Sequence, residues 1–312
     1  MRLFIYRSYN EGDIPPASLN SHAAPMLPIV GIITIFVMVF GGYILAGGKM
    51  SLIIAALPFE MMMIGGAAVG AFLISNGGTV LKKSLGGVKA VFSGPKWKKE
   101  DYRDLLTLMF ILTKTMKTKG LIALEQHLDK PHESSIFQRF PRILSDHFAL
   151  DFICDTLRMV SMSMDDPHQV ADAMERQLKK HHHEAAKPGD ALQSMADGTP
   201  ALGIVAAVLG VIKTMASIDQ PPAVLGKLIG GALVGTFLGV FLAYGFIGPF
   251  ASRYKQITDE DAQFYAVIRD AIISHLNGNA PQVSVEVARG NVPSDIQPSF
   301  AELDEVLNAT AV

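Results

Sequence analysis

Residues 228–252 read LIGGALVGTFLGVFLAYGFIGPFAS, an apolar stretch without a single Asp, Glu, Lys, Arg or His. Because about 20 helical residues cross the roughly 30 Å hydrocarbon core of a bilayer, this stretch predicts a membrane-spanning helix. Three similar stretches occupy residues 26–48, 61–81 and 198–212. The last is followed by Lys213, whose long side chain can reach the headgroups and let the helix continue. The predicted fold class is an all-α integral membrane protein with four transmembrane helices.

The composition supports a membrane protein and excludes other classes. Hydrophobic residues make up 49% of the 312 positions, while charged residues make up only 18%. The net charge of −2 leaves no basic excess for a nucleic-acid backbone, so no nucleic-acid partner is expected. Cys154 is the only cysteine, which excludes an internal disulfide framework and a Cys-rich metal site.

The distribution of lysine and arginine predicts the orientation of the four helices. With both termini in the cytoplasm, the outer connections hold only Lys49, Lys213 and Lys227 of the 27 basic residues. A large helical domain between spans two and three and a C-terminal tail are then cytoplasmic. The predicted segments are a polar N-terminal leader at 1–25, spans one and two at 26–81, the cytoplasmic helical domain at 82–196, spans three and four at 197–252, and the cytoplasmic tail at 253–312.

Hydrophobic periodicity predicts helices within the cytoplasmic parts. Residues 100–128 and 144–164 each place apolar side chains on one helical face. Asp166, followed by a proline, is typical of a helix start. In the tail, three prolines within residues 278–298 predict an extended or irregular segment, and residues 299–309 predict a last short helix.

The spans lack an obvious ion-carrying residue. No charged residue lies inside spans one, three or four, and we place Glu60 at the outer entrance of span two, after an apolar lead-in at 51–59. Since ion transporters need an ionisable residue near mid-membrane, this chain is not expected to carry an ion alone. A partner would bring the carboxylate, while this chain would supply the Thr236 hydroxyl and a glycine-lined wall.

Glycines at positions 231, 235 and 239 give span four one smooth side that permits close backbone approach. These glycines have two alternative roles, packing within the chain or packing against other subunits. His181 to His183 are consecutive, so on a helix they cannot converge on one metal ion and are expected on a solvated polar face. Protease and lipase motifs are lacking, so neither an enzyme nor a bound cofactor is predicted.

Spans three and four carry a resemblance to a known family. The sequences DGTPALGIVAAVLG at 197–210 and LVGTFLGVFLAYGFIGP at 233–249 resemble the corresponding spans of the flagellar motor stator A subunits, the MotA/PomA family within the wider MotA/TolQ/ExbB proton channels. The similarity extends over about residues 28–308. It also includes Phe40-Gly-Gly-Tyr, residues 104–125, Pro141-Arg-Ile-Leu, Leu150-Asp-Phe-Ile, Leu276-Asn-Gly and Pro298-Ser-Phe-Ala-Glu.

The resemblance implies a bacterial inner-membrane protein that forms a pentameric ring around two B subunits. Each B subunit would carry one membrane helix with the ion-binding Asp and a periplasmic anchor to peptidoglycan. Passage of the ion would turn the ring, and the cytoplasmic helices would push the switch protein of the rotor.

The resemblance also implies residue roles in force transmission. Lys117 and Glu125, on the helix predicted at 100–128, fall where the family engages the rotor, with Lys117 in place of the commoner arginine. The alternative is an ordinary solvated surface. Pro200 and Pro249 lie where the family couples the spans mechanically to the cytoplasmic helices. For each proline a plain helix boundary is the alternative.

The implied ion path comprises Thr236, Ala207 and Tyr244. Ala207 stands where sodium-driven members carry a threonine that helps to coordinate a dehydrated cation. A hard cation needs several oxygen ligands, so the missing hydroxyl favours a proton over sodium as the transported ion. The Thr236 hydroxyl has a competing role as a hydrogen bond back to its own helix.

Two other functions remain as alternatives. An energiser of outer-membrane processes of the ExbB/TolQ type also surrounds a single-span partner, but it has three spans and different cytoplasmic helices. A membrane scaffold or receptor without ion coupling would need exposed binding motifs in the cytoplasmic segment, and we identify none.

Overall fold

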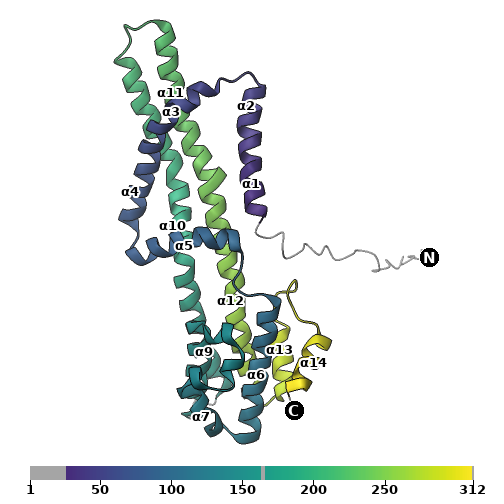
Figure 1. The fold of residues 1–312 in the computed structure, drawn as a ribbon. Helices are drawn as coiled ribbons and strands as arrows, with labels where there is room; N and C mark the ends of the chain where they lie inside the picture. Colours follow the sequence, from purple (N-terminus) through teal and green to yellow (C-terminus); the bar gives the residue numbers. More distant parts are fainter. Residues whose placement is uncertain (1–25, 163–165, 311–312) are drawn as a thin grey trace, which may run out of the picture.

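The computed structural model describes residues 26–162 and 166–310, and the regular structure within these ranges is helical. The leader predicted at 1–25 lies outside the described residues. Two helical columns run along most of the molecule (Figure 1). One is α10 (Pro167–Met215), and the other consists of α11 (Pro222–Leu242), the π-helical turn Ala243–Ile247 and α12 (Gly248–Leu276).

Four helices in the described ranges are long and apolar enough to span a membrane, which confirms the predicted number of spans. The first covers Leu27–Leu45, as α1 (Leu27–Phe36), the π turn Val37–Gly41 and α2 (Gly42–Leu45). The second covers Met50–Ser75, as α3 (Met50–Glu60), the π turn Met61–Gly65 and α4 (Gly66–Ser75). The third and fourth are parts of the two columns.

Span two lies earlier in the chain than predicted. Its helix begins at Met50 and ends at Ser75, where Asn76 adopts an extended backbone. Glu60 is therefore inside the span, and its placement at the entrance was wrong. The apolar lead-in is the first part of the same helix. The next helix, α5 (Gly78–Ser93), crosses the two columns between the two ends of the molecule (Figure 1).

The helical domain between spans two and three, here called the cytoplasmic domain after its predicted location, contains α6 (Lys99–Lys119), α7 (Ile122–Asp129), α8 (Pro141–Leu144) and α9 (His147–Ser161), with 3-10 turns at Pro131–Glu133 and Phe137–Arg139. The single helix predicted at 100–128 is wrong, because Gly120 has φ +78°, a left-handed conformation that ends α6. The helix predicted at 144–164 starts instead at His147, where the Asp146 side chain accepts the Ala149 N–H at 2.7 Å. The helix start at Asp166 is confirmed, since its side chain accepts the His168 N–H at 3.1 Å.

Large apolar side chains from distant parts of the chain form the core of this domain. Tyr102 and Phe110 of α6 and Phe264 of α12 are fully or almost fully buried there. Trp97 stacks on Phe264 with ring centroids 3.7 Å apart. The core therefore joins α6 to the column that continues into span four.

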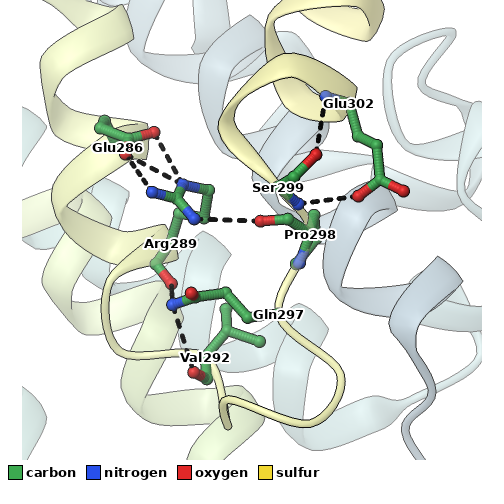
Figure 2. Close-up of polar contacts among 7 residues, drawn as sticks. All are labelled: Glu286, Arg289, Val292, Gln297, Pro298, Ser299 and Glu302. Carbon is green, nitrogen blue, oxygen red and sulfur yellow. Dashed lines mark hydrogen bonds and ion pairs between the residues drawn. The ribbon is translucent and has the colours of Figure 1, made fainter. Parts of the chain in front are cut away.

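The tail contains one helix more than expected. The segment predicted as irregular holds α13 (Pro281–Arg289), because Pro281 occupies the first helical turn, where its missing N–H costs nothing. Figure 2 shows that Arg289 pairs with Glu286 and also donates to the Pro298 carbonyl at 3.0 Å. These bonds hold the segment after α13 in place.

The short helix predicted at 299–309 is confirmed as α14 (Phe300–Thr310). A reciprocal capping arrangement starts it (Figure 2): the Ser299 N–H donates to the Glu302 carboxylate at 2.7 Å, and the Glu302 N–H donates to the Ser299 hydroxyl at 3.2 Å. Lys99 also donates to Glu302 at 2.9 Å, and this bond, with those to Ser299, lowers the pKa of Glu302 to about 2.

Candidate ion path and rotor-facing surface

The membrane parts of α10 and α11 meet along a line of small residues, here called the glycine seam: Gly203, Ala206 and Gly210 of α10 and Ala232, Gly235 and Gly239 of α11. A Cβ added at Gly239 would lie 2.8 Å from the Gly203 Cα and 3.1 Å from the Thr199 carbonyl oxygen. Such approach of two backbones is possible only without side chains. Packing within the chain therefore accounts for these glycines, whereas a Cβ at Gly231 would meet nothing within 4 Å.

Thr236 and Ala207, two predicted ion-path residues, flank this seam. Each follows a buried seam residue, Gly235 or Ala206, and each is itself half-buried. Successive helical residues point about 100° apart, and α10 and α11 run in opposite directions, so both positions turn to the same side of the seam. The Thr236 hydroxyl makes no hydrogen bond within the described part of the chain, unlike the hydroxyls of Thr199 and Thr214, which donate to carbonyl groups of their own helix.

Tyr244, the third predicted ion-path residue, is not beside the other two. It lies in the π turn of the same column, two turns beyond Thr236, or about 12 Å along the helix axis. Its side chain is 68% exposed in the single chain. Tyr244 is therefore available to a neighbouring chain or to lipid.

Exposed apolar side chains surround the glycine seam. The candidate span at Leu27–Leu45 buries none of its residues. On span three, Ile204, Val205, Val208, Leu209 and Ile212 are also exposed. Side chains of this kind are stable beside lipid or beside apolar surfaces of other chains.

Both predicted coupling prolines lie inside continuous helices, so the boundary interpretation is wrong for each. Pro200 is an interior residue of α10, and Pro249 follows the π turn within the uninterrupted helix Pro222–Leu276. Lacking an N–H, Pro200 leaves the Ala196 carbonyl without its helical donor. Pro188 is a further proline inside α10, which the sequence analysis did not single out.

Lys117 and Glu125 are exposed on different helices, near the end of α6 and within α7. The turn at Gly120 separates the two helices. Ile122, 80% exposed, lies between the two charged positions in sequence. In Figure 1, α7 and the end of α6 lie at the opposite end of the molecule from the turn that joins spans three and four.

Glu60 is the functional candidate that the sequence analysis misplaced. It is only 5% exposed, and its Oε2 atom is buried without a hydrogen-bond partner in the described chain. A Cβ added at Gly235 would lie 2.6 Å from this oxygen, so the carboxyl group lies directly against the glycine seam. The apolar lead-in at 51–59 was the signal in the sequence, because a span that starts there places Glu60 near mid-membrane.

The solvated face expected for the three consecutive histidines is wrong for His181. Its ring stacks on Phe148 at a centroid distance of 3.6 Å and meets the edge of Tyr265 at 5.1 Å. Burial lowers the pKa of His181. This histidine belongs to the packing between α9, α10 and α12.

Comparison with known proteins agrees with this arrangement. The family model described as "Motility protein A N-terminal" matches residues 29–120, and the "MotA/TolQ/ExbB proton channel family" matches residues 145–266. Motility protein A of Salmonella typhimurium is 39% identical over 284 residues, which cover 91% of this chain and 96% of that protein. Chemotaxis protein LafT of Vibrio parahaemolyticus is 33% identical over 282 residues, covering 90% and 98%.

Two solved structures share the fold. The structure of C. jejuni MotAB matches with a TM-score of 0.69 and 19% identity, covering 88% of this chain and 99% of the other. The flagellar MotAB stator complex from Bacillus subtilis matches with a TM-score of 0.64 and 23% identity, covering 83% and 92%.

Four spans, a large helical domain between spans two and three, and a glycine seam between spans three and four define a membrane protein of the proton channel class. Within that class, the chain belongs to the motility protein A family of flagellar motor stators.

Proposed function

We propose that the chain is the A subunit of a proton-driven flagellar stator in the bacterial inner membrane, with both termini in the cytoplasm. Five copies form a ring around two B subunits, whose Asp binds the ion and whose periplasmic domain anchors to peptidoglycan. Ion passage turns the ring, and the cytoplasmic helices transmit torque to the switch protein of the rotor.

The observation that carries this proposal is the pair of uninterrupted columns. α10 continues for 49 residues from the cytoplasmic domain into span three, and α12 continues span four into the cytoplasmic core. An α-helix rises 1.5 Å per residue, so each column is a stiff connection several tens of ångströms long. A rotation of the membrane helices therefore reaches the surface that holds Lys117 and Glu125 without a flexible joint.

The exposed apolar faces of spans one and three support assembly with other chains. The solved structures of the same fold are described as MotAB complexes, which supports a B-type partner. The side of the seam that carries Ala207 and Thr236 is the surface we assign to the partner helix and its Asp. Tyr244, exposed two turns away, lies on the cytoplasmic side of that path.

The number of hydroxyl groups beside the glycine seam supports proton coupling. Thr236 supplies one hydroxyl and Ala207 supplies none. A sodium ion that sheds its water needs several fixed oxygens, whereas a proton moves through carboxylates and water. The swimming speed is therefore expected to be independent of external sodium at constant ionic strength and pH, and to fall to zero with a protonophore.

The test is the swimming speed of a deletion strain complemented with this chain. Speed that rises with sodium, persists with the protonophore and stops with a sodium-channel blocker would contradict proton coupling. Full complementation of an outer-membrane energiser defect, without motility, would instead support the ExbB/TolQ type. Unchanged swimming of the deletion strain would leave only a scaffold function.

A further inference from the structure

Glu60 is placed where a membrane protein seldom keeps a carboxyl group. The helix of span two runs from Met50 to Ser75, so ten residues, or about 15 Å, separate Glu60 from the start of the helix. Half the thickness of a hydrocarbon core is also about 15 Å. Glu60 therefore lies near the middle of its span, and an ionisable residue at that depth indicates function unless a structural partner explains it.

No such partner is found in the described ranges. Oε2 of Glu60 is buried and without a hydrogen bond, and Glu60 forms no ion pair there. The helices of other spans that pack against this region are α10 and α11. Their nearest charged positions are Lys213 and Lys227, which are seven and eight residues along the chain from the contacts at Ala206 and Gly235, or about 10–12 Å along the axes.

A buried carboxylate without a cation or donors is too costly to persist, so the stable form here is the neutral acid. The neutral acid carries a proton that it can give up when a base or water reaches it. The carboxyl group lies directly against Gly235, so the glycine seam is the surface at which a base or water would meet it. Gly235, against which the Glu60 carboxyl group lies, immediately precedes Thr236, and the seam residue opposite it, Ala206, immediately precedes Ala207.

We propose that Glu60 is a proton-binding site of this chain, protonated at rest, which exchanges its proton across the glycine seam with the ion path beside Thr236. The site rests on the proposed function, since the path and the partner carboxylate belong to it. Its ligand is a proton, transferred as H⁺ to water or to the partner carboxylate, with Glu60 left briefly ionised and reprotonated from water. No bond other than O–H is made or broken.

The test uses the complete complex of this chain with its B subunit in proteoliposomes, with proton influx followed by a trapped pH-sensitive dye. Glu60→Gln keeps the size of the side chain but cannot exchange a proton. Because a positioned proton-transfer group typically contributes about 10²-fold or more to a proton-transfer step, we expect Glu60→Gln to lower the influx at least about tenfold. Glu60→Asp, which retains the acid, should recover part of it.

A second variant tests the contact at the seam without removing the acid. The Cβ of Gly235→Ala would lie 2.6 Å from the Glu60 carboxyl oxygen and must displace it. We expect reduced influx for this variant. The matched control is Gly70→Ala on span two, whose Cβ would meet nothing within 4 Å, and it should conduct as the unmodified chain does.

Infrared spectroscopy on the purified complex provides a measurement that does not depend on conduction. A protonated carboxyl band that shifts in D₂O and is lost in Glu60→Gln is expected. Absence of that band overturns the inference alone. So does an influx for Glu60→Gln within about twofold of that of the unmodified complex, because a proton-transfer group should have a much larger effect. An unmodified complex that assembles but passes no protons overturns the proposed function and the inference together.

Discussion

The cytoplasmic end of the molecule and its membrane end are held together by opposite means. In the cytoplasmic core, large side chains such as Phe110, Phe152 and Phe264 are fully or almost fully buried. In the membrane region, glycines and alanines bring backbones together, while most large apolar side chains remain exposed. The first is the expected product of the hydrophobic effect, and the second is how helices associate where water is absent.

The difference indicates which region is complete by itself. The cytoplasmic core buries its apolar surface within one chain, so its shape does not depend on partners. The membrane region leaves spans one and three largely uncovered and keeps an unpaired carboxyl group at Glu60. Its packing and its chemistry are therefore completed by lipid and other chains. The following four experiments test this division, from the largest expected effect to the smallest.

The glycine seam should tolerate no added side chain at its tightest point. Gly239→Ala forces a Cβ against the backbone of Gly203 and the carbonyl of Thr199, which cannot move aside as a flexible side chain would. Overpacking of this kind costs on the order of 1–3 kcal/mol or more in each copy, so we expect loss of the assembled complex and of motility. Gel filtration of the detergent-solubilised complex measures the first, and Gly70→Ala is the control. Normal assembly of Gly239→Ala would show that the seam is loose.

Pro200→Ala tests whether the column that joins the two regions must bend. Alanine restores an N–H for the Ala196 carbonyl and removes the steric conflict of an interior proline, worth roughly 3 kcal/mol of local helix stability. We expect the variant to insert and to bind its partner, but to lose most of its motility, because a straighter α10 would transmit the step of the ring in a changed direction. The measurement is swimming speed at matched protein level in the membrane.

Pro188→Ala, another interior position of α10, is the informative comparison for this result. Pro188 lies before span three in α10, outside the membrane region, where a change in the helix should have a smaller effect on the ring. Unimpaired swimming of Pro200→Ala would remove the mechanical role from Pro200 altogether.

The number of membrane spans could be predicted from the sequence, but the position of span two could not. Apolar runs of about 20 residues are local signals, so the four spans could be counted. A charged residue such as Glu60 normally marks the boundary of a span, and the glycine that accommodates it here, Gly235, is distant in sequence. No local sequence pattern indicates that Glu60 and Gly235 lie against each other.

In the cytoplasmic region, local conformation caused the errors. The left-handed φ of Gly120 divides a periodic segment into α6 and α7, although the periodicity continues across it. Pro281 starts α13 instead of interrupting it. The residue roles that the family resemblance implies for Lys117, Glu125, Pro200 and Pro249 remain predictions, since they concern motion and partners.

Reversal of the charges at the far end of the molecule should reduce torque without affecting assembly. Lys117→Glu with Glu125→Lys exchanges two exposed charges on separate helices. Neither of these two side chains contributes to the core. Like charges brought together at an interface cost on the order of several kcal/mol, so we expect torque to fall at least about twofold. The measurement is the rotation speed of tethered cells under load.

The matched control for charge reversal is Glu184→Lys with Lys187→Glu, which exchanges two exposed charges on α10 away from α6 and α7. Its torque should equal that of the unmodified chain. If both double variants rotate normally, the surface around α7 does not meet the rotor through these charges.

The smallest expected effect lies at the junction of the two regions, where Asp261 of α12 accepts the Lys96 N–H at 2.8 Å and so ties the segment after α5 to the column. Burial raises the pKa of Asp261 to about 6, more than its hydrogen bonds to Lys96 and Trp97 lower it. The folded protein thus holds this proton more tightly than the unfolded chain does. The resulting stabilisation is complete below the unfolded pKa of about 4 and is lost as the pH rises through about 6.

Asp261→Asn removes this titration and keeps the oxygen that accepts the Lys96 N–H. We therefore expect the melting temperature of the unmodified complex, relative to that of the variant, to fall between about pH 4 and about pH 6 and to stay level above that range. Differential scanning fluorimetry across this range measures it, with Asp151→Asn at an exposed position of α9 as the control. A constant difference across the range would mean that the pKa of Asp261 is not raised in the folded state, because the Lys96 and Trp97 N–H groups and the nearby lysine stabilise its charge at least as much as burial opposes it. The junction would then be an electrostatic contact, closer in kind to the exposed ion pairs of the cytoplasmic surface than to the unpaired carboxyl group at Glu60.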